Sequence, residues 1–499
     1  MLMAHDLGTT GNKATLHSSD GRTLASVTWS YDTSYRQGGV VEQDPEDWWD
    51  SVCGATRELL DRTGAAAAAI EGIAFSGQMM GVVLVSDDGR PTRPSIIWAD
   101  TRSRAQCERL SEAVGAEHAY AILGHRLNPT YSLSKLMWVR EQEPETFGAA
   151  TKMCLAKDYV VHRLTGVLAT DPSDASSTNA YDQGAQTWSD ELLAAAGLPR
   201  DLFPDIVPST AVVGRVSSDA AAATGLRTGT PVVMGGGDGP MAAVGAGVVE
   251  DSDGAYAYLG SSSWISFAAA KPVLDLPAMR TMTFNHVVPD RYVPTATMQA
   301  GGGSLHWVTD LLASQDEPGR FEQLIRSAAD VDAATEDLFF LPYLLGERSP
   351  YWNPAARAAF VGIGRHHGKD HLTRAVLEGV AFNLATCIGA FREHGQPIER
   401  VDAIGGGAAS ATWLQILADV WGCTVRRRSV VEEANSLGAA ITAGVGVGMF
   451  ADFSIARQLS EVVGVFEPDA DRHAAYQASH RRFVDAYARL EPWFDQAAT

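Results

Sequence analysis

The chain has 499 residues, 45% of them hydrophobic and 20% charged, a balance typical of a globular protein long enough to hold two domains. Its formal net charge of −21 disfavours nucleic acids and anionic membrane surfaces as partners. The five cysteines are scattered without a C-x-x-C pair, so neither a disulfide framework nor a cysteine zinc site is expected. With no signal peptide and no apolar run of about 20 residues, the pattern indicates a cytoplasmic protein.

Strand and helix patterns alternate along the chain, which predicts an α/β fold. A strand over 1–7 leads into a tight glycine turn. The next two strands, within 13–29, turn at Asp20-Gly21, and Asp-Gly between alternating segments is a strong hairpin signal. The later elements are, in chain order, helix 45–63, an alanine-rich helix end at 64–72, strands 70–78 and 94–100, helix 132–142, strand 230–236, and a closely packed Gly/Ala-rich helix over 437–451.

The second half of the chain begins with a copy of the first hairpin. Leu7-Gly8-Thr9-Thr10 and Leu259-Gly260-Ser261-Ser262 each join two strand patterns, and 252 residues separate them. Strand–Gly-Gly-Gly–helix junctions at Gly235 and Gly405 form a second pair, whose different spacing implies insertions between the copies. We therefore expect a duplicated fold, with an N-terminal domain over 1–247 and a C-terminal domain over 248–499.

The Gly-Thr-Thr-Gly turn after Asp6 has the composition of a phosphate-binding nest. Glycine lets successive backbone N–H groups point into one concavity, and the hydroxyls of Thr9 and Thr10 add donors. An aspartate beside phosphate requires a cation between them, so we expect Asp6 to hold hydrated Mg²⁺. An ordinary capped turn explains a single motif of this kind as well. The second copy, at Gly260, Ser261 and Ser262, favours a clamp that holds a polyphosphate from both sides of a cleft.

Asp238 lies among glycines where a helix is expected to start, and its residue type fits two roles. As a first-turn carboxylate it would only stabilise the helix N-terminus. At a strand end, where ligands gather in α/β sheets, it would serve as a general base. The junction 405–408 likewise fits either a flat adenine ring or a tightly packed helix start.

Other catalytic signatures are missing from the sequence. It has no Walker A loop, no protein-kinase motifs, no H-E-x-x-H and no G-x-S-x-G. No G-x-G-x-x-G follows the first strand, which disfavours an NAD-dependent dehydrogenase. His366, His367 and His371 have no acidic or cysteine partner in ligand spacing, so no metal site is expected there. Trp48 and Trp49 follow helical packing and are expected in the core or in contacts between domains.

A series of motifs runs in fixed order along nearly the whole chain: "DLGTTGNK", "VEQDPEDWW", "SGQMMG", "IIWADTRS", "AKDYVVHRLTG", "TDPSDASSTNAYD", "GGGDGP", "LGSSSW", "LPYLLGERSPYWNP", "RAVLEGVAFNL", "IGGGAASATWLQILAD" and "EEANSLGAAITAG". This order resembles the FGGY carbohydrate kinases, and within that family the xylulose kinases. The resemblance implies two ribonuclease-H-like domains of the actin/hexokinase type flanking a nucleotide cleft. It also implies transfer of a phosphoryl group from ATP to a sugar or polyol hydroxyl.

The resemblance also implies roles for individual residues. Asp238 matches the catalytic base and Asp6 the acid near the phosphates, and both are expected near Mg²⁺, through water. The segments that contact the acceptor supply Gln78, Met79, Met80, Thr130 and Tyr131, together with Asp238. The nucleotide-binding positions are Thr9, Thr10, Gly260, Ser261, Ser262, Gly302, His306, Gly407 and Ala408.

One position departs from the pattern of the xylulose kinases, because Met80 stands where they commonly have a histidine. A thioether scarcely exchanges hydrogen bonds with a sugar hydroxyl. D-Xylulose, giving D-xylulose 5-phosphate, is the first acceptor expected; ribulose, glycerol, erythritol, gluconate or a deoxy-ketose are alternatives. A non-catalytic ATP-binding protein of the same fold is a further alternative, and a homodimer is expected only by analogy with the family.

Overall fold

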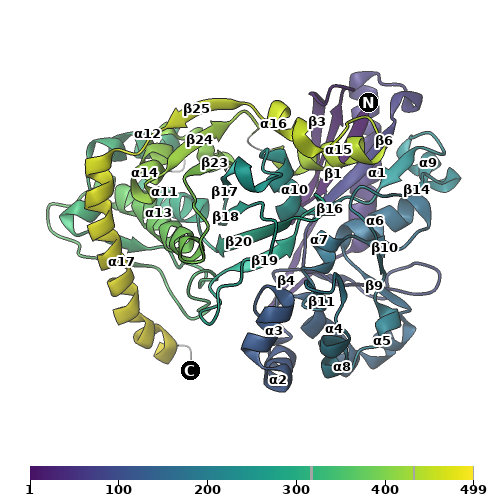
Figure 1. Cartoon of the computed structure of the whole chain (residues 1–499), viewed down its shortest axis with the longest axis horizontal. Coiled ribbons are helices and arrows are strands. Elements are labelled where there is room, and N and C mark those ends of the chain that lie inside the picture. The colour runs from purple at the N-terminus through teal and green to yellow at the C-terminus, as the bar shows by residue number, and fades with distance from the viewer. Residues whose placement is uncertain (315–318, 431–432, 498–499) are drawn as a thin grey trace.

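Two mixed β-sheets, one from each half of the chain, form the framework of the protein in a computed structural model (Figure 1). The structure describes residues 1–314, 319–430 and 433–497. Helices lie beside both sheets, which confirms the predicted α/β class (Figure 1).

The sheet of the N-terminal half has the order β14-β15-β6-β1-β2-β3, with β16 paired to β6. Strand β1 is antiparallel to β2 and parallel to β6, so the chain crosses over between β3 and β6. Its strands are β1 (Leu2–Leu7), β2 (Gly11–His17), β3 (Thr23–Ser30), β6 (Gly72–Gly77), β14 (Val212–Arg215), β15 (Pro231–Val233) and β16 (Gly236–Gly237).

Helix α1 (Pro45–Thr63) makes that crossover and occupies the predicted range. Asp44 caps the helix by accepting from the N–H of Glu46, and a proline suits the first turn. Gly64, at φ 64°, ends it, so the alanine-rich stretch that follows holds only a short 3₁₀ turn at Ala67–Ala69. The tryptophans of α1 pack in the N-terminal core, as expected.

The sheet of the C-terminal half has the order β19-β20-β18-β17-β23-β24-β25. Strand β17 is antiparallel to β18 and parallel to β23, which repeats the relation of β1 to β2 and β6 and confirms the duplicated fold. Its strands are β17 (Ala255–Leu259), β18 (Ser263–Phe267), β19 (Met282–Asn285), β20 (Tyr292–Met298), β23 (Arg400–Ile404), β24 (Thr424–Arg428) and β25 (Val462–Phe466).

The predicted pairing of the two Gly-Gly-Gly junctions is wrong. The junction at Gly235 follows β15, whereas the junction at Gly405 follows β23, whose counterpart in the first sheet is β6. The counterpart of β15 is β24, because each lies outside the strand that runs parallel to the first one. Glycine recurs at both places for a local reason: a Cβ at Gly235 would overlap the backbone of Phe75, and one at Gly405 would crowd the backbone of Leu259.

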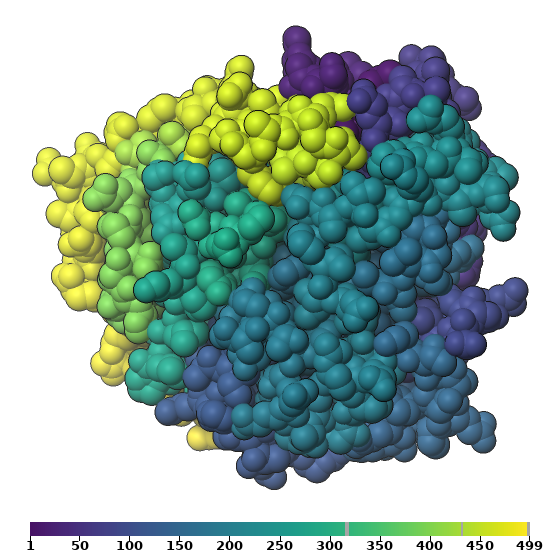
Figure 2. All heavy atoms as spheres, turned by 45° about the vertical axis from the view of Figure 1, so that its right-hand side comes forward, coloured from purple at the N-terminus to yellow at the C-terminus, as the bar shows by residue number. Residues whose placement is uncertain are grey.

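Two helices, α10 (Asp238–Gly245) and α15 (Ala434–Gly446), each pack against the sheet of the other half of the chain. Helix α10, from the first half of the sequence, packs on Tyr256 and Ile404 of the second sheet. Helix α15, from the second half, packs on Leu2 and Ala74 of the first sheet. Figure 1 shows α15 lying against the purple N-terminal strands, and in Figure 2 yellow residues of the second half likewise touch the purple N-terminal residues. Each half therefore completes the core of the other.

The close approach of α10 and α15 depends on glycine. A Cβ at Gly245 would overlap the carbonyl oxygen of Ala434, and one at Gly438 would overlap that of Met241. The Gly/Ala-rich run is thus a closely packed helix, as predicted, but it ends at Gly446 instead of continuing to 451. The chain turns there because Met449 and Phe450 donate their N–H groups back to the carbonyl of Gly444.

Helix α13 (Lys369–Glu393) is mostly buried in the core of the C-terminal half. Its length and apolar composition would suffice to cross a membrane, but 83% of the apolar window is buried inside the protein. Helices α14 (Ala411–Trp421) and α17 (Ala470–Ala497) contribute to the same core. All five cysteines are free and buried, in line with the expected absence of a disulfide framework.

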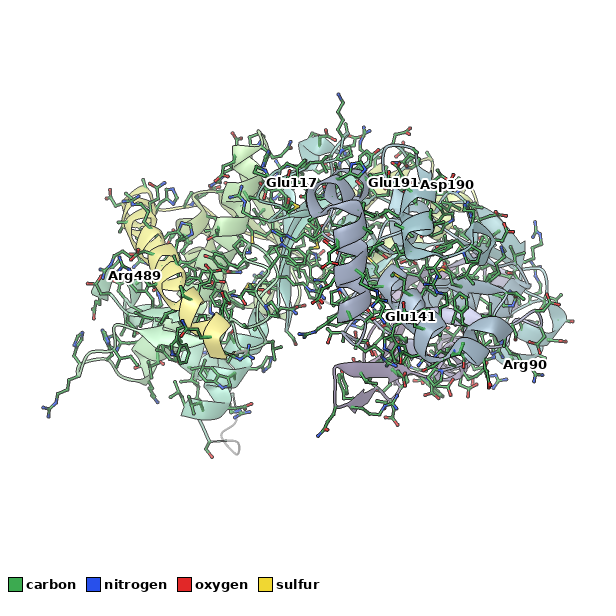
Figure 3. All side chains as sticks on the ribbon, turned by 90° about the horizontal axis from the view of Figure 1, so that it is seen from below. Arg90, Glu117, Glu141, Asp190, Glu191 and Arg489 are labelled. Carbon is green, nitrogen blue, oxygen red and sulfur yellow. The ribbon has the colours of Figure 1, made fainter. Side chains whose placement is uncertain are left out.

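Most of the remaining elements form the lower part of the N-terminal half, and those after residue 300 belong to the C-terminal half. Figure 3 views this side from below, with Glu117, Glu141, Asp190 and Glu191 labelled on the N-terminal half and Arg489 on α17. The elements are β4 (Ser34–Arg36), β5 (Val40–Gln43), β7 (Val83–Val85), β8 (Ser95–Ile96), α2 (Arg104–Val114), α3 (Ala116–Leu123), α4 (Ser132–Gln142), α5 (Pro144–Ala149), β9 (Lys152–Cys154), α6 (Ala156–Thr165), β10 (Ala169–Thr170), α7 (Pro172–Ala175), β11 (Tyr181–Asp182), β12 (Thr187–Trp188), α8 (Asp190–Ala196), β13 (Asp205–Ile206), α9 (Ser218–Thr224), α11 (Gly302–Leu312), α12 (Arg320–Ser327), β21 (Phe339–Leu341), β22 (Ala359–Val361) and α16 (Ala456–Leu459).

Candidate active site

The first glycine turn joins β1 to β2 and is held from several sides. The N–H of Gly8 donates to the carbonyl of Gly11 at 3.0 Å, which closes the turn. The carbonyl of Thr9 accepts from the Gln43 amide at 2.6 Å, and its hydroxyl accepts from the Trp98 indole at 2.9 Å. Thr10 is exposed at the tip of the turn. These bonds fix the backbone of the turn.

Asp6 stands at the end of β1, beside this turn. One carboxylate oxygen accepts from the hydroxyl of Ser76 at 2.7 Å and from the amide of Asn435 at 3.3 Å. Ser76 is the partner of Asp6 across the β1–β6 pair, whereas Asn435 comes from α15 in the second half. Burial raises the pKa of Asp6, and these two hydrogen bonds together with Lys13 oppose the shift.

Asp238 is the first residue of α10, directly after the Gly236–Gly237 strand. The N–H of Gly239 donates to one of its carboxylate oxygens at 2.8 Å. Burial raises the pKa of Asp238 to about 7, and the negative charge of Asp6 adds to the shift. Two half-buried carboxylates that repel each other form an oxygen donor set of the kind that hard divalent cations prefer. The residues present therefore fit a divalent metal ion.

A cavity of about 140 Å³ opens beside Asp238. Its apolar walls come from the segment after β6 and from strands of the second sheet, whereas its polar groups include the carboxylate of Asp238 and the guanidinium of Arg348. The lining residues are Met79, Met80, Trp98, Asp238, Gly239, Pro240, Ser262, Trp264, Ser266, Met282, Phe284, Thr295, Thr297 and Arg348.

The structure places the predicted acceptor residues at different distances from this cavity. Met79 and Met80 line it with Asp238. Tyr131 packs behind Met80 and donates its hydroxyl to the sulfur of Met282 at 3.3 Å. Thr130 lines a neighbouring cavity, of about 380 Å³, that shares Arg348. The amide of Gln78 points towards the first turn, where it donates to Gln43 at 2.7 Å.

The predicted nucleotide positions of the second half gather around the second turn. The N–H groups of Gly302 and Gly303 donate to the carbonyls of Gly260 and Ser261, at 2.8 and 3.0 Å. A Cβ at Gly302 would lie 2.6 Å from the Gly260 carbonyl oxygen, so α11 starts directly against this turn. Ser262 lines the cavity beside Asp238. The second turn thus lies between the start of α11 and Asp238.

The junction after β23 also reaches the second turn. A Cβ at Gly407 would lie 2.8 Å from that of Leu259, the residue before the turn, and Ala408 is buried. A Cβ at Gly406, by contrast, would meet nothing within 4 Å, so Gly406 borders open space. Glycine at position 407 is therefore explained by packing alone. His306 lies further along α11, partly stacked on Phe321 with ring centroids 5.0 Å apart.

Several cavity residues were not predicted from the sequence. Trp98 is an aromatic residue inside a predicted strand, and Trp264 and Arg348 belong to segments used only for secondary structure or family resemblance. Met282 and Phe284 lie in a segment for which the sequence predicted no element or motif. Only the relative placement of the two sheets brings these residues to Met79 and Met80.

The histidine cluster acquires an acidic neighbour that the sequence spacing did not reveal. Glu336 lies 3.4 Å from His366 and 3.7 Å from His367, measured between Oε2 and Nε2. The Nδ1 of His367, however, accepts from the N–H of Gly364 at 2.9 Å, so its Nε2 carries the proton and has no lone pair to offer a metal ion. The Nδ1 of His371 similarly accepts from the N–H of Gly368. These hydrogen bonds hold the loop before α13 and do not favour metal ligation.

Comparison with known proteins gives consistent results over the full chain. Models of the FGGY family of carbohydrate kinases match residues 1–245 with its N-terminal domain and residues 255–447 with its C-terminal domain. The sequence is 35% identical over 494 residues to the xylulose kinase of Escherichia coli (strain K12), with 99% of each chain covered. The structure is similar to those of a xylulose kinase from Rhodospirillum rubrum (TM-score 0.91, 31% identity) and a gluconate kinase from Lactobacillus acidophilus (TM-score 0.93, 26% identity), with 99% of each chain covered.

Proposed function

The chain belongs to the FGGY family of carbohydrate kinases, and on that premise we propose that it phosphorylates the terminal hydroxyl of D-xylulose with ATP, giving D-xylulose 5-phosphate and ADP. One observation carries this proposal: a single cavity is lined both by Asp238 and by Ser262 of the second glycine turn. An acceptor in that cavity has a carboxylate beside its hydroxyl and a phosphate-binding turn on the other side. This is the arrangement that in-line phosphoryl transfer needs.

Asp238 is the proposed general base. It accepts the proton of the acceptor hydroxyl as the new P–O bond forms and the hydroxyl becomes acidic. Its pKa of about 7 places the carboxylate close to the operating pH, where proton transfer in both directions is efficient. The hydrogen bond from Gly239 fixes the orientation of the carboxylate towards the cavity.

The two glycine turns are proposed to bind the phosphates of ATP. Their backbone N–H groups, with the hydroxyls of Thr9, Thr10, Ser261 and Ser262, donate to phosphoryl oxygens whose negative charge changes during transfer. Asp6 and Asp238 would hold Mg²⁺ through water, and the ion would neutralise charge on the transferred group. Nucleotide contacts are proposed for Gly260, Gly302, His306, Gly407 and Ala408.

We propose that the acceptor contacts Met79 and Met80. Gln78, from the same segment, and Thr130 and Tyr131, which precede α4, are proposed to complete its binding site. Gluconate is the second candidate acceptor, because the chain is also similar to a gluconate kinase and because Arg348, in the same cavity, suits a carboxylate.

All five cysteines are free and buried, and we propose a cytoplasmic enzyme.

A coupled measurement of ADP release tests the proposal. Purified protein is supplied with ATP and a divalent cation together with D-xylulose, ribulose, glycerol, erythritol, gluconate or a deoxy-ketose. We expect the highest kcat/KM with D-xylulose, and a loss of about 10²- to 10⁴-fold in kcat for Asp238→Asn with ATP binding retained. Highest kcat/KM with gluconate would favour the second candidate. ATP binding without ADP release in the presence of any of these acceptors would favour a non-catalytic ATP-binding protein.

A further inference from the structure

Lys135 is a fully buried lysine behind the acceptor cavity, on helix α4. Its ammonium donates to three backbone carbonyls, those of Met80 at 3.0 Å, Ile97 at 2.8 Å and Thr130 at 2.5 Å. An ammonium has three protons, so all of its donors are used. Among the residues that the structure describes, no carboxylate forms an ion pair with it.

The three acceptors of Lys135 belong to three separate segments around the acceptor cavity. Met80 follows β6, Ile97 follows β8 and precedes Trp98, and Thr130 precedes α4. Met80 and Trp98 line the acceptor cavity, and Thr130 lines its neighbour. One side chain therefore joins three walls that are otherwise remote in the sequence.

The bond to Met80 has a particular consequence, because Met80 adopts φ 66°, which is unusual for a residue other than glycine. Such a conformation persists only when neighbouring groups hold it. Lys135 holds the carbonyl of Met80, and the hydroxyl of Ser177 accepts from its N–H at 3.2 Å. Lys135 and Ser177 thus hold the two peptide groups on either side of the Met80 side chain, and this fixes where its thioether lies in the cavity.

Burying an ammonium without a bonded carboxylate is costly. Burial lowers the pKa of Lys135 to about 7; Asp100 opposes this shift, and Arg348 and Arg102 add to it. A neutral, apolar side chain would avoid that cost but would leave three buried carbonyls without donors. A lysine at this position is therefore explained by the three carbonyl groups that it holds together.

We infer that Lys135 is a positioning residue that assembles the acceptor pocket and sets its affinity for the sugar. This inference rests on the proposed function of the cavity. Lys135 does not touch the reacting atoms, and it acts through Met80, Ile97 and Thr130. Its loss weakens acceptor binding and leaves the transfer step largely intact.

A second buried lysine, Lys157 on α6, supports the other side of the site. Its ammonium lies 2.6 Å from Asp158 and 3.0 Å from both Asp171 and Asp174, and all four side chains are fully buried. Asp171 in turn accepts from the hydroxyl of Ser173 at 2.6 Å. This cluster lies beside β16, the strand that ends at Gly237, because a Cβ at Gly236 would lie 3.3 Å from a carboxylate oxygen of Asp171.

The link from the cluster to Asp238 is one hydrogen bond. The N–H of Gly237 donates to the hydroxyl oxygen of Ser173 at 2.9 Å, and a Cβ at the preceding Gly236 would lie 2.7 Å from that oxygen. The residue after Gly237 is Asp238. The geometry points to Ser173 as a positioning residue for the base, held by Asp171 and Lys157, so its loss lowers the rate of transfer and not the affinity for the sugar.

The two positioning residues are tested against each other with steady-state kinetics of the full chain. Lys135→Met raises the KM for the acceptor at least about tenfold and changes kcat and the KM for ATP less than about threefold. Ser173→Ala lowers kcat about tenfold with an unchanged KM for the acceptor. Equal changes in both variants, or an unchanged acceptor KM in Lys135→Met, overturn the assignment. If Lys135→Met does not fold, Lys135→Arg takes its place, since a planar guanidinium cannot direct donors to the same three carbonyls.

Hydrogen exchange separates this inference from the proposed function. A wild-type protein that phosphorylates no sugar refutes the proposed function but leaves the contacts of Lys135 open to test. In the Lys135 variant, the amides of 78–82, 96–100 and 128–131 should lose protection together, while those around Ser173 keep theirs. Loss of protection confined to α4 overturns the positioning role.

Discussion

The contact between helices α10 and α15 makes a quantitative prediction about Gly438. A Cβ at this position would overlap the carbonyl oxygen of Met241 and lie 2.9 Å from its carbonyl carbon. Ordinary contacts of a Cβ are longer than 3.4 Å, so Gly438→Ala forces the two helices apart by about 1 Å. Because Met241 lies one turn after Asp238 on α10, that shift also displaces the proposed base.

Two opposing effects determine the stability of this variant. Alanine in place of glycine inside a helix stabilises it by about 1 kcal/mol, whereas overpacking a buried contact costs about 1–3 kcal/mol. Gly389→Ala is the matched control, because Gly389 is also inside a helix, α13, but a Cβ there would meet nothing within 4 Å. The difference between the two variants isolates the cost of the contact.

Urea unfolding and steady-state kinetics provide the assay. Gly389→Ala should be as stable as the wild type or more so, with unchanged kcat. Gly438→Ala should be about 1–3 kcal/mol less stable than the control, and its kcat should fall about a hundredfold, the effect expected of a 1 Å displacement of a catalytic group. If Gly438→Ala matches the control in both stability and kcat, the required close approach of the helices is refuted.

Three further predictions concern the metal, the acceptor and pH. Asp6→Asn should raise the divalent-cation concentration for half-maximal velocity at least about tenfold, and an unchanged titration would contradict the metal role of Asp6. Met80→His, which restores an imidazole in the acceptor cavity, should increase kcat/KM for D-xylulose about fivefold relative to a deoxy-ketose, and an unchanged ratio would show that Met80 does not read a hydroxyl. Burial lowers the pKa of His125 from the ordinary value of 6.5 to about 4. Above pH 6.5 the imidazole is neutral in both the folded and the unfolded state, and its contribution to stability is complete. As the pH falls towards 4 only the unfolded state gains a proton, which lowers the free energy of unfolding by up to about 3 kcal/mol. The gap in unfolding free energy between wild type and His125→Gln should therefore shrink from pH 7 to pH 4, and a constant gap would contradict the shift.

The sequence alone determined those features that depend on neighbouring residues. The range of α1 follows from Asp44, Pro45 and Gly64, which cap, start and end the helix within its own sequence. The two glycine turns were found from local composition, and their repetition predicted the duplicated sheets. The start of α10 at Asp238 was equally local, because Pro240 and the preceding glycines mark it. Turn and cap chemistry acts over a few residues, so it can be read from the sequence.

Only the tertiary structure decided which distant groups meet. It placed Asn435 beside Asp6, brought Met282 and Phe284 to the cavity of Met79 and Met80, and corrected the pairing of the glycine junctions. It also showed that a lysine in an otherwise ordinary helix connects three walls of that cavity. These contacts join residues up to 429 positions apart, and they depend on how two sheets and helices α10 and α15 pack, which no local pattern encodes.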